Sequence, residues 1–175
     1  FIQGAVAWTV SLVSFPFLAL PAPKSTGPED FSPGWLDQVL AASGALAGAD
    51  PAVQQGLAAQ TLGGAIVGIY PDSHLEQVEY IINHSDSIYV VAGDQEQADK
   101  MLDIKEKCPG VSKVIVDNPK GMRHYGDPIL VFFKDIQKMG HELAEKEPSL
   151  FENMIEQVSP DDVGMLNYTS GTTGI

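Results

Sequence analysis

Short apolar runs alternate with amphipathic stretches over the middle of the chain. Residues 63–70, 87–93 and 111–117 are rich in Val and Ile and are bounded by Gly, Pro or Asp, which is typical of buried strands. Between them, residues 72–83 and 94–107 carry apolar side chains at helical spacing. Strand, helix, strand, helix, strand with short connections predicts βαβ units and a parallel sheet. Because such crossovers are right-handed, we expect consecutive helices to cover one face of the sheet unless the strand order reverses.

The ends of these two helices carry start and stop signals. Asp72 or Ser73 can cap the first helix, and Glu76 stands three residues after Ser73, as in a capping box. The second helix begins with acidic residues and ends with lysines, an arrangement that the helix dipole favours. Pro109 and Gly110 then stop it.

The alternation continues towards the carboxyl end. Residues 129–133 form a short apolar run that predicts a strand, and residues 134–146 have the pattern of a helix. Residues 148–158 suit another helix or a turn, and residues 163–168 suit a strand. The predicted fold class is therefore α/β, with a mostly parallel sheet flanked by helices.

The first 57 residues have a different character. Residues 24–57 are rich in Ala, Gly, Pro and Ser, and they predict only a weak helix over residues 36–46. Residues 5–23 are apolar, but Pro16 interrupts them and no basic region precedes them. This favours a buried or amphipathic segment over a secretory signal or a membrane span.

Composition narrows the class of protein. The 175 residues carry 23 acidic and 10 basic side chains, for a formal net charge of −13. Nucleic acids attract basic surfaces, so this balance argues against a nucleic-acid partner. The single cysteine, Cys108, can form neither an internal disulfide nor a metal cluster, and we interpret it as structural. One thiol agrees with a cytoplasmic location.

Residues that often carry chemistry are scattered along the chain. The four histidines are His74, His84, His124 and His141. Their spacing matches no metal-ligand pattern, so no metal site is predicted. His84, Ser85 and Asp86 are the residue types of a catalytic triad, but triad residues meet in space and cannot be recognised by adjacency. We therefore do not interpret them as a triad.

The sequence YTSGTTGI closes the chain, and it has the composition of an anion-binding loop. Gly171 and Gly174 permit a positive φ, so successive backbone N–H groups can point at one anion. The hydroxyl side chains between them add donors, and the loop follows a predicted strand, where α/β sheets bind ligands. The Walker pattern is excluded because the glycines are too close and no Lys follows. An ordinary solvent-exposed turn stays open as the alternative.

The amino-acid sequence of this loop resembles a known signature. YTSGTTG is similar to the phosphate-binding motif of the adenylate-forming enzymes, which usually continues as Pro-Lys-Gly-Val, and the preceding SPDDVGMLN resembles its usual lead-in. Upstream, GIYPDSHLEQVEYIINHS resembles the long-chain fatty acyl-CoA synthetase branch. The resemblance covers residues 58–175 and implies part of the N-terminal domain of such an enzyme. Residues 1–57 do not share it, so we expect them to be divergent or to be foreign sequence joined near residue 57.

The resemblance implies an ATP-dependent fatty acid–CoA ligase with ATP, Mg²⁺ and coenzyme A as cofactors or co-substrates. Six residues would then hold the β- and γ-phosphates of ATP: Thr169, Ser170, Gly171, Thr172, Thr173 and Gly174. Catalytic residues are expected beyond Ile175, so we expect the 175-residue chain to be inactive alone. The alternative is a non-catalytic remnant or interaction module that keeps part of the α/β fold. A fatty-acid substrate is compatible with peripheral membrane contact, whereas acyl chain length and oligomeric state are not predicted.

Overall fold

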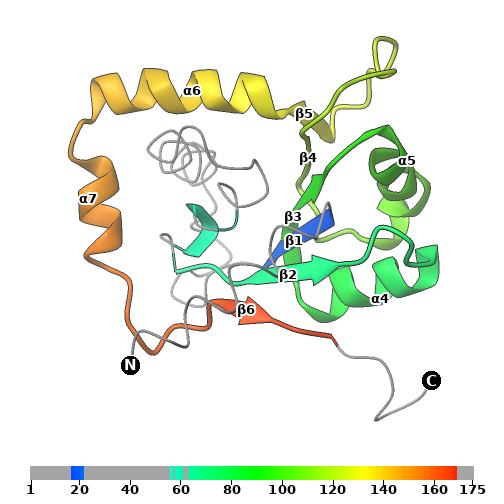
Figure 1. Cartoon of the computed structure of the whole chain (residues 1–175), viewed down its shortest axis with the longest axis horizontal. Coiled ribbons are helices and arrows are strands. Elements are labelled where there is room, and N and C mark those ends of the chain that lie inside the picture. Colours follow the sequence, from blue (N-terminus) through cyan, green and yellow to red (C-terminus); the bar gives the residue numbers. More distant parts are fainter. Residues whose placement is uncertain (1–16, 22–55, 57, 61–62, 169–175) are drawn as a thin grey trace.

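The computed structural model describes residues 17–21, 56, 58–60 and 63–168 (Figure 1). In chain order, its elements are β1 (Phe17–Pro21), β2 (Ile66–Ile69), α4 (Leu75–His84), β3 (Ser87–Ala92), α5 (Gln95–Ile104), the short 3₁₀ helix η1 (Lys105–Lys107), β4 (Lys113–Val116), β5 (Leu130–Phe132), α6 (Phe133–Lys146), α7 (Leu150–Ile155) and β6 (Met165–Leu166). Within the described residues, six strands form one sheet in the order β5-β4-β3-β1-β2-β6. The predicted sequence of alternating strands and helices is thereby confirmed.

Most of the sheet is parallel, as the sequence predicts. β3 pairs with β4, β4 with β5, and β2 with β6, all in parallel. The exception is β1, which is antiparallel to both of its neighbours, β2 and β3. Because β1 is antiparallel to each, β2 and β3 run in the same direction, as a βαβ unit through α4 requires. The α/β class with a mostly parallel sheet is therefore confirmed.

The position of β1 is a feature that the sequence pattern did not predict. It belongs to the apolar stretch that we expected to be buried or amphipathic, and it forms a strand inside the sheet. Ala19 is aligned with Val67 on one side and with Val90 on the other. The βαβ crossover thus leaves β2 and β3 one strand apart, and a segment from the N-terminal 57 residues lies between them (Figure 1). The weak helix predicted over residues 36–46 lies outside the described residues.

Side chains alternate between the two faces of the sheet, which is the period of two that a strand imposes. One face contributes a buried row from three parallel strands: Val67, Ile69, Val90, Ala92, Val114 and Val116. Helices α4 and α5 cover this face together, with Val78 and Ile82 from the first helix and Met101 and Ile104 from the second. The expectation that consecutive helices share a face is confirmed.

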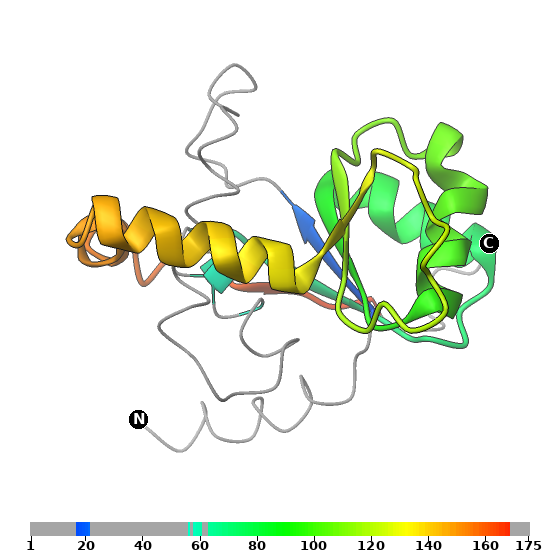
Figure 2. The same cartoon turned by 90° about the horizontal axis from the view of Figure 1, so that it is seen from above.

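The opposite face buries the intervening residues of the same strands: Ile66, Tyr89, Val91 and Ile115. Its cover is Ala58 and Ala59, just before β2, and Phe133 and Ile136 in the first turns of α6. Beyond those turns, α6 runs away from α4 and α5 (Figure 2). This face is therefore covered by residues that come before β2 and by the start of α6, which follows β5.

The start of α5 carries acidic residues, as the sequence predicts, and Asp94 is its cap, which the sequence analysis did not predict. The Asp94 Oδ1 accepts a hydrogen bond of 3.1 Å from the Gln97 backbone N–H. The prediction for α4 was wrong by one or two residues, since its N-cap is His74. Ser73 is used in a turn instead, where its backbone N–H donates to the Tyr70 carbonyl at 3.0 Å. The His74 N–H then donates to Gln77 Oε1 at 3.2 Å, in place of the expected Glu76.

The connection between β4 and β5 depends on one glycine. Gly121 has φ +89°, which L side chains rarely adopt, and it lies against the Gln95 side chain. Gln95 Nε2 donates to the Tyr125 hydroxyl at 2.8 Å, and that hydroxyl donates to Asp99 Oδ1 at 2.7 Å. These contacts fasten the connection to α5.

Gly121→Ala is expected to lower the free energy of unfolding by about 1–3 kcal/mol, because alanine is strained at this φ. Its Cβ would also stand 2.1 Å from Gln95 Oε1, so Gln95 would have to leave Tyr125. Urea denaturation followed by circular dichroism measures the change. Gly126→Ala is the matched control, since no heavy atom lies within 4 Å of its added Cβ. Equal midpoints for the two variants would contradict the role given to Gly121.

Candidate functional site

The six residues predicted to hold phosphate, 169–174, lie outside the described residues. The structure does describe the strand that leads into them. β6 is an edge strand in parallel register with β2, Ile66 opposite Met165 and Val67 opposite Leu166 (Figure 1). The loop therefore follows the carboxyl end of an edge strand of a mostly parallel sheet. That is the edge at which open α/β sheets bind ligands.

The start of β6 is held by two hydrogen bonds to one carbonyl. The Gly164 carbonyl accepts from the Ile66 backbone N–H at 3.1 Å and from Gln60 Nε2 at 2.9 Å. A Cβ at Gly164 would lie 3.2 Å from Gln60 Nε2, so a side chain there would push the amide away. Just upstream, a turn is closed by Asp162, whose Oδ2 accepts from the Ser159 N–H at 2.7 Å.

The end of β6 is held by an aromatic cluster that consists of Tyr80, His84 and Tyr168. The Tyr168 hydroxyl and His84 Nδ1 share a hydrogen bond of 2.7 Å. Tyr80 stacks on the His84 ring at 5.3 Å between centroids, and Tyr168 meets both rings edge-on. Tyr168 is the residue directly before Thr169, so this cluster stands at the base of the predicted loop.

The surroundings of Tyr168 favour the protonated form of its hydroxyl. Burial raises the pKa of Tyr168, nearby Tyr80 and Asp86 raise it further, and a hydrogen bond from Ser85 opposes the rise. A protonated phenol can donate to an unprotonated imidazole nitrogen. In the contact between Tyr168 and His84, the histidine tautomer decides which group donates.

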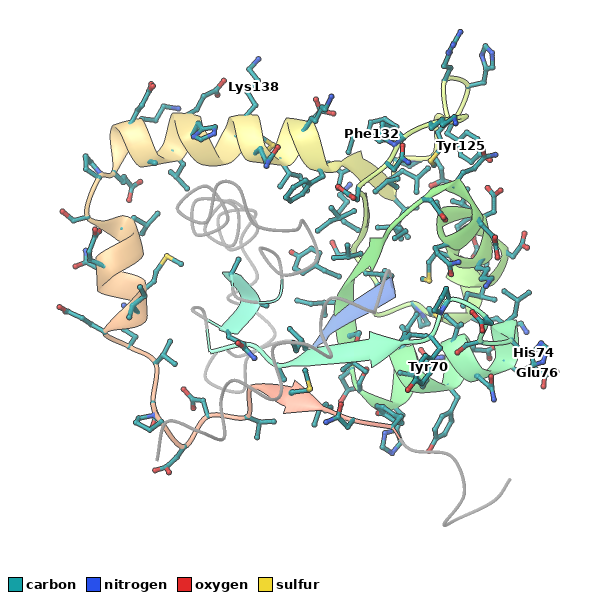
Figure 3. All side chains as sticks on the ribbon, in the orientation of Figure 1. Tyr70, His74, Glu76, Tyr125, Phe132 and Lys138 are labelled. Atoms are coloured by element: carbon teal, nitrogen blue, oxygen red, sulfur yellow. The ribbon has the colours of Figure 1, made fainter. Side chains whose placement is uncertain are left out.

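The cluster was missed in the sequence, although one half of it was visible there. Tyr80 and His84 are four residues apart on α4, a spacing that places side chains side by side on a helix. Tyr168 comes from 84 positions further along the chain, and no local pattern pairs it with α4. Figure 3 shows the connection from β2 to α4: Tyr70 directly follows the strand, and His74 and Glu76 lie at the start of the helix.

The remaining histidines and the apparent triad do not form a site. His74 lies at the start of α4, whereas His141 lies in α6. Ser85 is buried, and its hydroxyl contacts Ser87 Oγ at 2.6 Å, while His84 Nδ1 is engaged by Tyr168. Over the described part of the chain, no group of three His, Cys, Asp or Glu side chains could hold a metal ion.

Cys108 is buried, as a structural thiol should be. Burial raises its pKa, Glu79 adds to the rise, and Lys107 opposes it, so the thiol is a poor nucleophile near neutral pH. Cys108 lines an open hollow, a surface pocket of about 390 Å³ that lies where the chain passes from α5 into β4. Both lysines of that hollow are engaged: Lys105 with the Asp127 carboxylate, and Lys113 with the Pro128 carbonyl at 2.8 Å. The hollow therefore does not present free cations to a ligand.

Comparison with known proteins agrees with this arrangement. A protein-family model described as "AMP-binding enzyme" matches residues 56–175, which is more than half of the chain. This match shows the class of protein: the chain belongs to the AMP-binding enzyme family. The match begins close to the change of character near residue 57. The division of the chain at that point stays a prediction.

Individual relatives are long-chain ligases by name. The chain is 28% identical over 114 residues to "Long-chain-fatty-acid--CoA ligase ACSBG2" of Xenopus laevis, covering 64% of the chain and 14% of that protein. It is 28% identical to ACSBG2 of Homo sapiens over 113 residues, 65% of the chain and 16% of that protein. It is 29% identical over 115 residues to ACSBG1 of Rattus norvegicus, 64% of the chain and 15% of that protein.

The chain thus spans about one seventh of the length of these curated relatives. Among its described helices, none combines the length and the apolar character that crossing a membrane requires.

Proposed function

We propose that the chain is part of an ATP-dependent long-chain fatty acid–CoA ligase and carries its triphosphate-binding loop. The observation that supports this most directly is the sequence TSGTTG directly after β6, in a chain that the AMP-binding family model matches through residue 175. The names of the relatives support the substrate class, a long-chain fatty acid.

The proposed reaction has two steps. A carboxylate oxygen of the fatty acid attacks the α-phosphorus of ATP, a new P–O bond forms, and pyrophosphate leaves. The sulfur of coenzyme A then attacks the acyl carbon, gives up its proton to solvent, and displaces AMP to leave the thioester. The residues for these chemical steps are expected in the remaining length of such a ligase.

The role of residues 169–174 is to neutralise and position phosphate. Backbone N–H groups around Gly171 and Gly174 can converge on one anion, and four hydroxyls from Thr and Ser add donors. Residues 169–175 include no Lys or Arg, so the loop offers dipoles without a full positive charge. We therefore expect affinity for ATP in the millimolar range.

When bound, Mg²⁺ would supply positive charge that stabilises the phosphates. The described residues do not fit a protein-held magnesium site, because no group of three potential ligand side chains gathers among them. In the proposal the cation arrives as the MgATP complex, and no step depends on a ligand from the described residues.

Titration of ¹⁵N-labelled chain with MgATP tests the proposal. We expect the amide signals of residues 169–174 to shift and saturate at millimolar concentrations, with smaller shifts elsewhere. Magnesium sulfate at equal ionic strength is the control for non-specific anion effects. Thr172→Val should weaken binding about threefold to fivefold, since it removes one donor and keeps the shape. A loop that does not respond to MgATP would favour the non-catalytic alternative.

The isolated chain is also expected to give no acyl-dependent exchange of pyrophosphate into ATP. The reason is that a phosphate loop binds and orients a substrate but provides no group that assembles the reacting carboxylate. Exchange is measured with labelled pyrophosphate in the presence and absence of a long-chain fatty acid. A clear acyl-dependent signal from the purified chain would refute this expectation.

A further inference from the structure

β6 is a two-residue strand at the edge of the sheet. Within the described residues it spans Met165–Leu166 and pairs on one side only, with β2. Both of its residues are half-buried, whereas their ladder partners Ile66 and Val67 are fully buried. A strand with two ladder pairs and little buried surface separates from a sheet more easily than the buried strands beside it.

The chain that leads into β6 adds little to its attachment. α6 and α7 lead away from the other helices, and the chain returns to the sheet at β6 (Figure 1). Residues 159–163, the last ones before Gly164, are all exposed. The attachment begins at the Gly164 carbonyl, which accepts hydrogen bonds from the Ile66 N–H at 3.1 Å and from Gln60 Nε2 at 2.9 Å.

A second attachment lies at the other end of β6. The Tyr168 hydroxyl shares a hydrogen bond of 2.7 Å with His84 Nδ1, and the Tyr80 ring stacks on the His84 ring. His84 is the last residue of α4, a helix that is fixed to the sheet by buried Val78 and Ile82. Residues 164–168 are therefore held at both ends by side chains from other parts of the fold.

The two attachments support each other through the strand between them. Met165 packs partly buried against the core on one face of the sheet, and Leu166 and Tyr168 pack against the core on the other face. If one end is released, only two ladder pairs and these half-buried contacts connect it to the end that is still attached. We therefore expect the two ends to separate from the sheet together.

We propose that residues 164–168 open from the sheet and close on it as one unit, while the rest of the sheet stays folded. The hydrogen bonds from Gln60 and between Tyr168 and His84 set how often this unit is open. In the open state the Ile66 N–H loses its partner, and the edge of β2 becomes accessible to water or to another strand. No part of this device depends on the proposed function, because opening and closing require no ligand.

Hydrogen exchange of backbone amides in the 175-residue chain, followed by NMR, measures this opening. Successive N–H groups of a strand point to opposite sides. The Ile66 N–H bonds to Gly164, so the Gly68 N–H also points towards β6 and the Val67 N–H points towards β1. Ile66 and Gly68 thus report on the two ends of β6, and Val67 is the reference amide on the same strand.

Three variants separate local opening from unfolding of the whole chain. Tyr168→Phe keeps the ring contacts and removes the hydroxyl, and Gln60→Met keeps a side chain of similar length and removes the donor. Tyr125→Phe is the matched control. It removes a hydroxyl that donates to Asp99 Oδ1 at 2.7 Å, in the connection between β4 and β5 at the opposite edge of the sheet.

We expect Ile66 and Gly68 to exchange faster than Val67 and with a weaker dependence on urea, because local opening exposes little surface. Tyr168→Phe and Gln60→Met should each speed up exchange at both Ile66 and Gly68 about fivefold, the factor that corresponds to one neutral hydrogen bond. Tyr125→Phe should speed up exchange at Val67, which requires unfolding of the sheet, and should leave Ile66 and Gly68 unchanged.

Three results would overturn the proposal. If Tyr125→Phe speeds up Ile66 and Gly68 as much as Val67, β6 leaves the sheet only when the whole chain unfolds. If Gln60→Met affects only Ile66 and Tyr168→Phe affects only Gly68, the two ends of β6 open separately and there is no single unit. If Tyr168→Phe and Gln60→Met change the exchange of neither amide, the two side-chain contacts do not hold β6.

Discussion

Replacing Ala19 by proline is expected to lower the free energy of unfolding by about 1–3 kcal/mol or more, out of a typical total of about 5–15 kcal/mol. β1 lies between β2 and β3, with Ala19 aligned to Val67 and to Val90. Proline has no N–H to donate, so a carbonyl inside the sheet loses its partner, at about 1–3 kcal/mol. The ring also clashes with the neighbouring strand, and proline is found almost only in edge strands.

Ala19→Ser is the matched control, because it changes the side chain by one atom and keeps the N–H. Urea denaturation gives the two midpoints, and hydrogen exchange of the Val67 and Val90 amides reports on the two strands beside β1. We expect the proline variant to lose protection at both amides and the serine variant to keep it. If both variants unfold at the same urea concentration, Phe17–Pro21 does not pair inside the sheet.

Met101→Ala is expected to lower the free energy of unfolding by about 2–5 kcal/mol. Met101 lies in α5 with 0% of its surface exposed, and it packs against the sheet face formed by Val90 and Val114. Truncation removes three heavy atoms from a closely packed layer and leaves a cavity that the surrounding strands cannot fill. Alanine favours helix at least as well as methionine, so the loss comes from packing and not from helix propensity.

Met139→Ala provides the control on α6, where the methionine is 43% exposed. It makes the same chemical change within a helix, but little buried area is lost, so we expect a difference of about 0.5 kcal/mol or less. Thermal and urea unfolding of both variants measure the contrast. A Met101 variant as stable as the Met139 variant would show that α5 does not pack on the sheet as described.

Local sequence patterns predicted the repeating part of the fold. The apolar runs contain β2, β3 and β4, and the amphipathic stretches contain α4 and α5, because the side-chain periods of two and 3.6 are set by neighbours in the chain. The acidic start of α5 was predicted from the sequence, and the structure shows that Asp94 is its cap. The cap of α4 was not, because the backbone turn from Tyr70 to Ser73 forms before the helix and moves its start to His74.

For the candidate site too, the sequence predicted one part and the structure revealed another. The composition of residues 169–174 and their resemblance to a known motif predict a phosphate loop, and this stays a prediction because these residues lie outside the described part of the chain. The contact between Tyr168 and His84 joins residues 84 positions apart, and only the docking of β6 beside β2, over the end of α4, brings them together.

The sequence by itself thus determined the α/β class, the βαβ order and the membership in the AMP-binding enzyme family, since all three depend on local periodicity and short motifs. Only the tertiary structure decided that Phe17–Pro21 lies between β2 and β3 and that Tyr168 is tied to α4. The physical reason is the same in both cases. Strand pairing and side-chain contacts across long stretches of chain depend on which surfaces remain uncovered after the local elements have packed, and no local pattern encodes that.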